Sequence, residues 1–150
     1  MQFPLLNNSQ QTDAYFLDLL KTVKTIALVG ASSKPHRASY EVMSFLQEHN
    51  FRVIPINPIL AGQNLLGEKV YASIAEIPIS VDMVEIFRNS EAAGSICEEV
   101  SQLTLEKQPK IIWMQIGVMN QTAAKRAQAS GMTVVMDQCP KRILQKAAEL

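Results

Sequence analysis

The stretch TIALVGASSKPHRAS, residues 25–39, decides the fold. Its first five residues are apolar or β-branched and end at Gly30, and such a uniformly apolar run is typical of a strand buried on both faces. A segment of helical period follows from about Ser39 to His49. Its predicted inner face is formed by Val42, Phe45, Leu46 and His49. A buried strand that leads through a glycine-containing loop into a helix is typical of a parallel α/β sheet.

The alternation of short apolar runs and helical segments continues along the chain. It predicts further strands at residues 51–56, 81–87, 111–114 and 133–136. Helices are predicted around the apolar stripe Ala93, Ile96, Cys97, Val100 and Leu103, between Asn120 and Gly131, and at residues 141–150. Another helix, with Phe16, Leu19, Leu20 and Val23 on one side, precedes the first strand.

Strands separated by helices of about ten residues or more need crossover connections, which produce a parallel sheet with helices on both faces. We therefore predict a doubly wound, Rossmann-type α/β fold with five parallel strands. An N-terminal segment, residues 1–24, is expected to pack its helix on a domain formed by residues 25–150, as one globular unit. Such folds bind ligands at the carboxyl ends of their strands, so functional residues are expected directly after each strand.

The charge balance limits the kinds of partner. The 150-residue chain carries 14 Lys and Arg against 14 Asp and Glu. Its zero net charge gives no overall attraction to nucleic acid or to an anionic membrane, so an anionic ligand has to be held by local groups. No apolar run approaches the roughly 20 residues of a membrane span, and the polar residues 1–11 lack the pattern of a secretory signal. A cytoplasmic protein is expected.

Cysteine and histidine usage gives no sign of a metal site. Cys97 and Cys139 lie far apart without neighbouring ligands, and the two histidines, His36 and His49, are separated by the predicted helix. Both thiols are expected to be free, with Cys97 as a core residue on an apolar helical face. Cys139 precedes Pro140 at a helix start, where a thiol pKa can be lowered, so it is a candidate reactive thiol, although no base accompanies it.

The loop after the first strand is the main candidate for ligand binding. Gly30 permits a tight turn, and Ser32, Ser33 and the free amides of the following helix can donate hydrogen bonds to a phosphate. Lys34 and Arg37 add positive charge. We interpret this loop as a pyrophosphate cradle; the alternative is an ordinary strand-to-helix loop with solvated charges. Its candidate ligand-binding residues are Gly30, Ala31, Ser32, Ser33, Lys34 and Arg37.

This loop departs from the dinucleotide fingerprint GxGxxG, because Ser32 and Pro35 stand where the second and third glycines would be. After the second strand, the sequence PINP at residues 55–58 offers no carboxylate for the ribose diol of NAD. Asn57 can still hydrogen-bond a ribose or an adenine edge. Pro55 and Pro58 either fix the backbone of this loop for ligand binding or only mark a turn.

The third and fourth strands are followed by further candidates. Phe87 is expected to flank an adenine, and Arg88 either binds a phosphate or pairs with Glu91 on the surface. Gln115 is expected to point into the cleft. Trp113, within the fourth strand, is expected to belong to the core rather than to a stacking platform.

Together these strand ends resemble the small stand-alone CoA-binding proteins, whose domain is similar to the N-terminal CoA-binding domain of the succinyl-CoA synthetase α-subunit. The likeness covers about residues 25–150 and rests on five motifs: VGAS at 29–32, PINP at 55–58, VD at 81–82 leading to FR at 87–88, WMQIGV at 113–118, and Cys139. The resemblance implies that the ADP moiety of CoA lies near residues 30–34, Asn57 and residues 87–88. From charge, we assign the 3′-phosphate to Arg37 or Lys34.

The sequence thus predicts non-catalytic binding of coenzyme A or an acyl-CoA. Succinyl-CoA synthetases follow this domain with one that carries a phosphorylated histidine, and neither His36 nor His49 has a pattern suited to phosphoryl transfer. The sequence also lacks a GxSxG elbow, a Walker A loop and an HExxH pair. Two alternatives remain open: an NAD(P)-binding redox protein, and a ligand-free interaction subunit of a larger complex. A protein partner is compatible with each of these functions.

Overall fold

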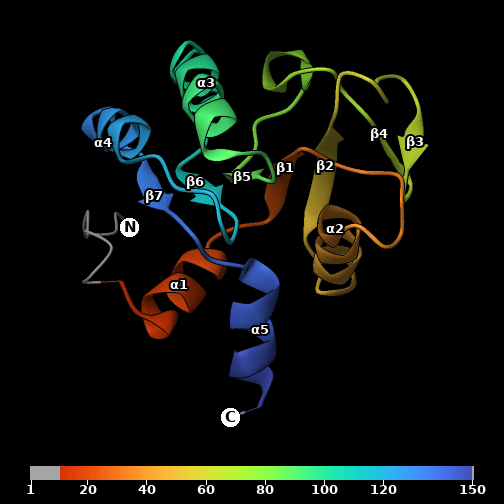
Figure 1. The fold of residues 1–150 in the computed structure, drawn as a ribbon, viewed down its shortest axis with the longest axis horizontal. Coiled ribbons are helices and arrows are strands. Elements are labelled where there is room, and N and C mark those ends of the chain that lie inside the picture. The colour runs from red at the N-terminus through yellow and green to blue at the C-terminus, as the bar shows by residue number, and fades with distance from the viewer. Residues whose placement is uncertain (1–10, 150) are drawn as a thin grey trace.

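A computed structural model, which describes residues 11–149, has a five-stranded parallel sheet at its centre (Figure 1). The strand order is β2-β1-β5-β6-β7, and every neighbouring pair is parallel. The fold is therefore a doubly wound α/β sandwich, as the sequence predicts. The strands span Thr25–Val29 (β1), Arg52–Ile56 (β2), Met83–Ile86 (β5), Ile111–Met114 (β6) and Thr133–Val135 (β7).

Helices cover both faces of the sheet, which gives the molecule three layers (Figure 1). On one face lie α1 (Asp13–Leu20), α2 (Ala38–Glu48) and α5 (Pro140–Ala148); on the other lie α3 (Ser90–Ser101) and α4 (Gln121–Ala129). Each face has its own apolar cluster, and Trp113, fully buried against Phe16, belongs to the cluster under α1. No helix in the described part of the chain is both long and apolar enough to cross a bilayer.

The sheet contains one topological switch point, between β1 and β5. From β1 the chain passes through α2 to β2 on one side, and it then returns to place β5 on the other side of β1. The helices that follow β1 and β5 therefore lie on opposite faces, and the loops at the carboxyl ends of these strands diverge. In open α/β sheets the crevice formed in this way is where ligands bind.

The structure adds elements that the sequence pattern did not predict. A two-stranded antiparallel pair, β3 (Asn64–Leu65) and β4 (Glu68–Lys69), and a short 3-10 helix, η2 (Ile74–Glu76), occupy the connection from β2 to β5. They are too short to show a period in the sequence. Residues 1–10 of the predicted N-terminal segment, and Leu150 of the predicted last helix, lie outside the described residues.

Several predicted limits and faces shift by small amounts. The strand predicted at residues 81–87 is shorter at both ends: β5 spans Met83–Ile86, and Phe87 already belongs to the loop after it. In α2 the buried face is Ser39, Val42, Met43 and Leu46. The prediction that His49 faces the sheet is wrong: His49 is exposed beyond the end of α2, and its ring stacks on that of Phe45. Because α2 ends at Glu48, the chain leaves the helix before His49, which no longer follows the helical period.

One carboxyl group is buried in the centre of the sheet. Glu85, on β5, has no exposed surface, and neither carboxyl oxygen has a hydrogen-bond partner among the described residues. It shares its register with Leu28 and Trp113, so its side chain faces the α1 layer. Burial raises the pKa of Glu85 to about 8, because an ionised carboxylate loses its hydration there. Glu85 is therefore predominantly protonated at neutral pH.

We predict that replacing Glu85 by glutamine removes a pH-dependent loss of stability. The pKa of Glu85 lies above its ordinary value of 4.5, so its contribution is fully present below pH 4.5 and is lost as pH rises towards 8. The slope is at most about 1.4 kcal/mol per pH unit. The measurement is urea unfolding of wild type and Glu85→Gln from pH 4 to 9. The stability difference should grow with pH in favour of the variant; a pH-independent difference would contradict the assignment. Glu98→Gln, at an exposed site, is the control.

Candidate functional site

Two adjoining cavities form one groove at the carboxyl ends of β1, β2 and β5. The first, which we call the loop cavity, has a volume of about 580 Å³ and is walled by the β1–α2 loop, Asn57, Leu60 and Phe87. The second, which we call the α3 cavity, has a volume of about 630 Å³ and lies between α3, the strand ends and residues 72–74. The two cavities share Gly30, Asn57 and Ile59. The groove thus spans the switch point.

Gly30 sets the geometry at the centre of the groove. Its φ of +93° lies in the left-handed region, and a Cβ atom at this position would overlap the carbonyl oxygen of Phe87. The Gly30 amide donates to the carbonyl oxygen of Ile56 at 3.0 Å. The backbones after β1, β2 and β5 therefore converge at Gly30, and only a glycine allows this approach.

The start of α2 faces the loop cavity without a side-chain cap. Thr12, Asn89 and Asn120 cap α1, α3 and α4 by accepting a backbone N–H, whereas Arg37 at the N-cap of α2 and Cys139 at the N-cap of α5 make no such bond. The start of α2, unlike that of α5, lines the loop cavity. The free amides at the first turn of α2 and the positive end of its dipole are thus available to an anion. Ala38 and Ser39 line the cavity at this point.

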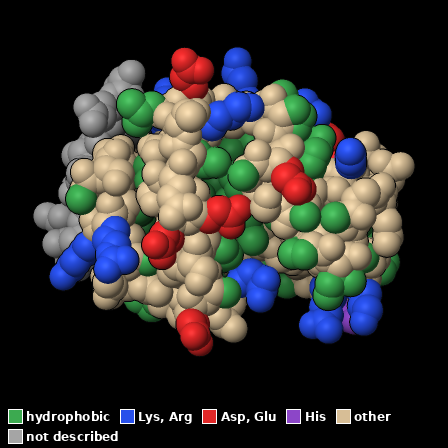
Figure 2. All heavy atoms as spheres, turned by 90° about the horizontal axis from the view of Figure 1, so that it is seen from above, with side chains coloured by type: hydrophobic (Ala, Val, Ile, Leu, Met, Phe, Trp, Pro, Cys, Tyr) green, Lys and Arg blue, Asp and Glu red, His purple; other side chains and the backbone are tan. Residues whose placement is uncertain are grey.

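The β1–α2 loop supplies hydroxyl groups and positive charge. The Ser32 hydroxyl oxygen accepts from the Lys34 amide at 3.1 Å, which leaves its proton free to be donated outward. Lys34 and Arg37 are exposed, and none of the described residues that line the loop cavity carries a carboxylate. Elsewhere charges of both signs are interspersed, as Figure 2 shows for the face that carries α3. The loop cavity is therefore a local site for a negatively charged group.

Asn57 has a structural role that the sequence did not reveal. Its amide nitrogen donates to the carbonyl oxygen of Ala31 at 2.8 Å, and its amide oxygen accepts from the Ile59 amide at 2.8 Å. The side chain thus joins the loop after β1 to the loop after β2. Contact between Asn57 and a ribose or adenine stays a prediction, because these bonds already engage one donor and one acceptor of the amide.

The other predicted residues are distributed between the two cavities, with one exception. Phe87 lines the loop cavity, and Pro58 and Arg88 line the α3 cavity. Gln115 is buried, lies outside both sets of walls, and has an amide oxygen without a partner among the described residues. All predicted binding residues except Gln115 therefore border the groove. Among the walls that the sequence did not identify, Ser73 and Ile74 belong to the unpredicted connection around η2.

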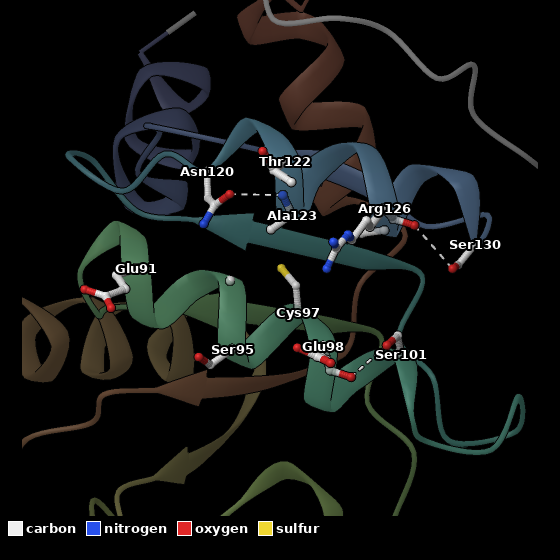
Figure 3. Close-up of a pocket in the computed structure, with 12 residues that line it drawn as sticks. Glu91, Ser95, Cys97, Glu98, Ser101, Asn120, Thr122, Ala123, Arg126 and Ser130 are labelled. Carbon is white, nitrogen blue, oxygen red and sulfur yellow. Dashed lines mark hydrogen bonds between the residues drawn. The ribbon is translucent and has the colours of Figure 1, made fainter.

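Neither cysteine is placed as a nucleophile. Cys139 is the N-cap of α5 and is buried among the apolar residues under α1, α2 and α5. Burial raises the pKa of Cys97 to about 11, which keeps that thiol protonated. In Figure 3 the Cys97 sulfur lies at the base of a separate hollow between α3 and α4, of about 590 Å³. Among residues 11–149, no group of His, Cys, Asp and Glu side chains is arranged to hold a metal ion.

The fold and the groove define the class of protein: a doubly wound α/β protein with a candidate ligand-binding groove at its switch point. Residues 24–145 match the model of the CoA binding domain, so the chain belongs to this family. Family membership supports CoA binding by this chain at the level of the domain. It agrees with the resemblance seen in the sequence motifs.

Curated proteins and solved structures include relatives of this chain. The chain is 36% identical to the uncharacterized protein YneT of Bacillus subtilis over 83% of this chain and 87% of that protein. It is 34% identical to the α subunit of acetate–CoA ligase (ADP-forming) I of Pyrococcus furiosus over 63% of this chain, but over only 21% of that subunit. A hypothetical protein from Pyrococcus horikoshii has a similar structure, with a TM-score of 0.83, 31% identity, and coverage of 97% and 98% of the two chains.

We predict that Gly30→Ala destabilises the protein and abolishes binding in the groove. The left-handed φ alone costs about 1–2 kcal/mol, and the clash with the Phe87 carbonyl adds to this cost. Gly131→Ala is a matched control, because Gly131 has the same φ of +93° but open space where an alanine would place its Cβ atom. Thermal unfolding should show a clearly larger loss for Gly30→Ala. Equal decreases in melting temperature for the two variants would mean that the Phe87 carbonyl does not crowd position 30.

Proposed function

We propose that this chain binds coenzyme A or an acyl-CoA through its ADP moiety and catalyses no reaction by itself. The observation that carries the proposal is the uncapped start of α2, which lies at the switch point beside Ser32 and two cations. The amides at this helix start, the hydroxyl groups and the cations all favour a diphosphate in the loop cavity. Family membership supports CoA as the source of that diphosphate.

The two cavities suit the two ends of the ADP moiety. With the diphosphate at α2, the nucleoside extends past Gly30 into the α3 cavity, whose walls are largely apolar. Arg88, which lines that cavity and lies close to Gly30, is then near the ribose and its phosphate. Lys34 and Arg37 on the opposite rim provide further positive charge. The groove therefore offers three cations, which suits a ligand with three phosphate groups.

NAD(P) suits this groove less well than CoA. Dinucleotide sites use a second glycine for close approach of the diphosphate and a carboxylate for the ribose diol. Ser32 takes the position of that glycine, and Asn57 follows β2 with its amide committed to the Ala31 and Ile59 backbone. An NAD(P)-binding redox protein thus remains an outcome of the test below, as does an interaction subunit that binds no nucleotide.

The non-catalytic part of the proposal rests on the groups that surround the groove. The described residues that line it include no histidine and no cysteine. Cys139 is buried at the start of α5 with no base among the groups that hydrogen-bond it. The ligase subunit of Pyrococcus furiosus extends well beyond the part that this chain matches. For the part that matches, we therefore propose only ligand binding and not the activity of the whole ligase.

We predict that CoA raises the melting temperature of the protein more than dephospho-CoA, NADH, NADPH or ATP does. A ligand at 100 times its dissociation constant stabilises the native state by about 2.7 kcal/mol. For a chain of this size that is a shift of roughly 5 to 10 °C. Dephospho-CoA lacks the 3′-phosphate and should give a smaller shift. If no CoA species changes the melting temperature at millimolar concentration, the proposal is wrong; a larger shift with NADH or NADPH would favour the redox alternative.

Variants that remove single charges test whether CoA binds in the loop cavity. Arg37→Ala and Lys34→Ala should each weaken CoA binding several-fold, because each removes a charge from the loop cavity. Lys125→Ala is the control, since Lys125 is an exposed residue of α4 outside the groove. Calorimetric titration at low salt is the measurement. Equal effects of all three substitutions would place the ligand elsewhere.

A further inference from the structure

The α3 cavity follows one face of α3. Ala92, Ser95, Ile96 and Glu99 line it, and their spacing of three, four and seven residues places them along one side of the helix. Residues 72–74 form the facing wall, so the cavity is a slot between α3 and the η2 segment. Its floor is apolar, with Val29 and Ile56 at the strand ends. A flat, largely apolar group is suited to such a slot.

Glu99 is the only carboxylate that lines either cavity of the groove within the described chain. Glu99 is half-buried, and its side chain forms no hydrogen bond or ion pair within residues 11–149. Apart from Glu99, the polar side chains of the slot are Asn57, Ser73, Arg88 and Ser95. The other charged side chains of the groove are cations, which favour an anionic ligand. A carboxylate in this groove therefore favours a ligand that also carries a hydrogen-bond donor.

The position of Glu99 suits the far end of a nucleoside. Seven residues separate Ala92, in the first turn of α3, from Glu99, which is a rise of about 10 Å along the helix. Gly30 and Arg88 line the same cavity, and the diphosphate and ribose are proposed to lie beside them. That span is comparable with the reach of adenosine from its 5′-phosphate to its 6-amino group. A base in the slot thus directs its outer edge towards Glu99.

The chemistry of that edge distinguishes one purine from another. Adenine carries an amino group at C6, which donates hydrogen bonds, whereas guanine and hypoxanthine carry an oxygen there, which accepts them. An ionised carboxylate only accepts. Where it meets the C6 substituent itself, it pairs with the amino group of adenine and repels an oxo group, so the wrong base is rejected by an unpaired polar contact. The 6-oxopurines also carry a proton on N1, so the selectivity depends on the carboxylate lying at C6 rather than at N1.

We propose that Glu99 accepts a hydrogen bond from the 6-amino group of adenine and makes the α3 cavity selective for an adenine nucleotide. This inference rests on the proposed CoA function and adds the residue that selects the base. It predicts that Glu99 discriminates between ligands that differ only at C6, while the phosphate-binding residues of the loop cavity do not.

The test compares CoA with deaminated CoA, in which hypoxanthine replaces adenine and all phosphates remain. Calorimetric titration of the wild type should show that deaminated CoA binds about tenfold more weakly or worse. Glu99→Gln should bind the two ligands within about twofold of each other, because a glutamine amide both donates and accepts. Glu98→Gln is the matched control: Glu98 lies in the hollow between α3 and α4, on another face of α3 (Figure 3), so its replacement should leave the discrimination intact.

The outcomes separate this inference from the proposed function. If the wild type binds CoA but does not discriminate, or if Glu99→Gln keeps the discrimination, Glu99 does not read the base, and the proposed function stands. If the wild type binds neither ligand, both proposals are wrong. The melting temperature of each unliganded variant is measured alongside, and it should change little, because Glu99 makes no hydrogen bond or ion pair to a described residue.

Discussion

The convergence of three backbones at Gly30 is the constraint on which the rest of the structure depends. The Gly30 amide is bonded to the Ile56 carbonyl, and the Phe87 carbonyl stands where any larger residue would place its Cβ atom. This contact joins the ends of β1, β2 and β5 and fixes the direction in which the chain enters α2. The helix start and its free amides are therefore held against the switch point before any ligand is present, which keeps the cost of ordering the site low.

Some polar groups near Gly30 hold the fold together, and others are available to a ligand. Asn57 joins two loops through its amide, and side-chain caps satisfy amides at the starts of α1, α3 and α4. At α2 the amides are left for a ligand. Because the chain has no net charge, the affinity for an anion has to come from this local arrangement rather than from a long-range field.

The sequence predicted the sheet and its parallel strands, because buried strands and helical stripes leave strong periodic signals. It also predicted ten of the residues that line the groove, from their positions after the strands. It did not predict the segment around η2, whose elements are shorter than any period, so the α3 cavity and the position of Glu99 stayed hidden. Gln115 and Asn57 show a second limit. Both follow strands as expected, yet packing buries the first, and backbone groups engage the second. The direction of a side chain after a strand depends on loops that pattern alone does not specify.

The central claim is that CoA occupies the groove at the switch point, and a map of backbone amide shifts on titration with CoA tests it most directly. The account predicts that the amide signals of residues 30–39, together with those of Arg88 and of the α3 residues that face the slot, shift and saturate together, while those of α4 do not. Saturable shifts confined to the hollow between α3 and α4, or no shift at all, would contradict it.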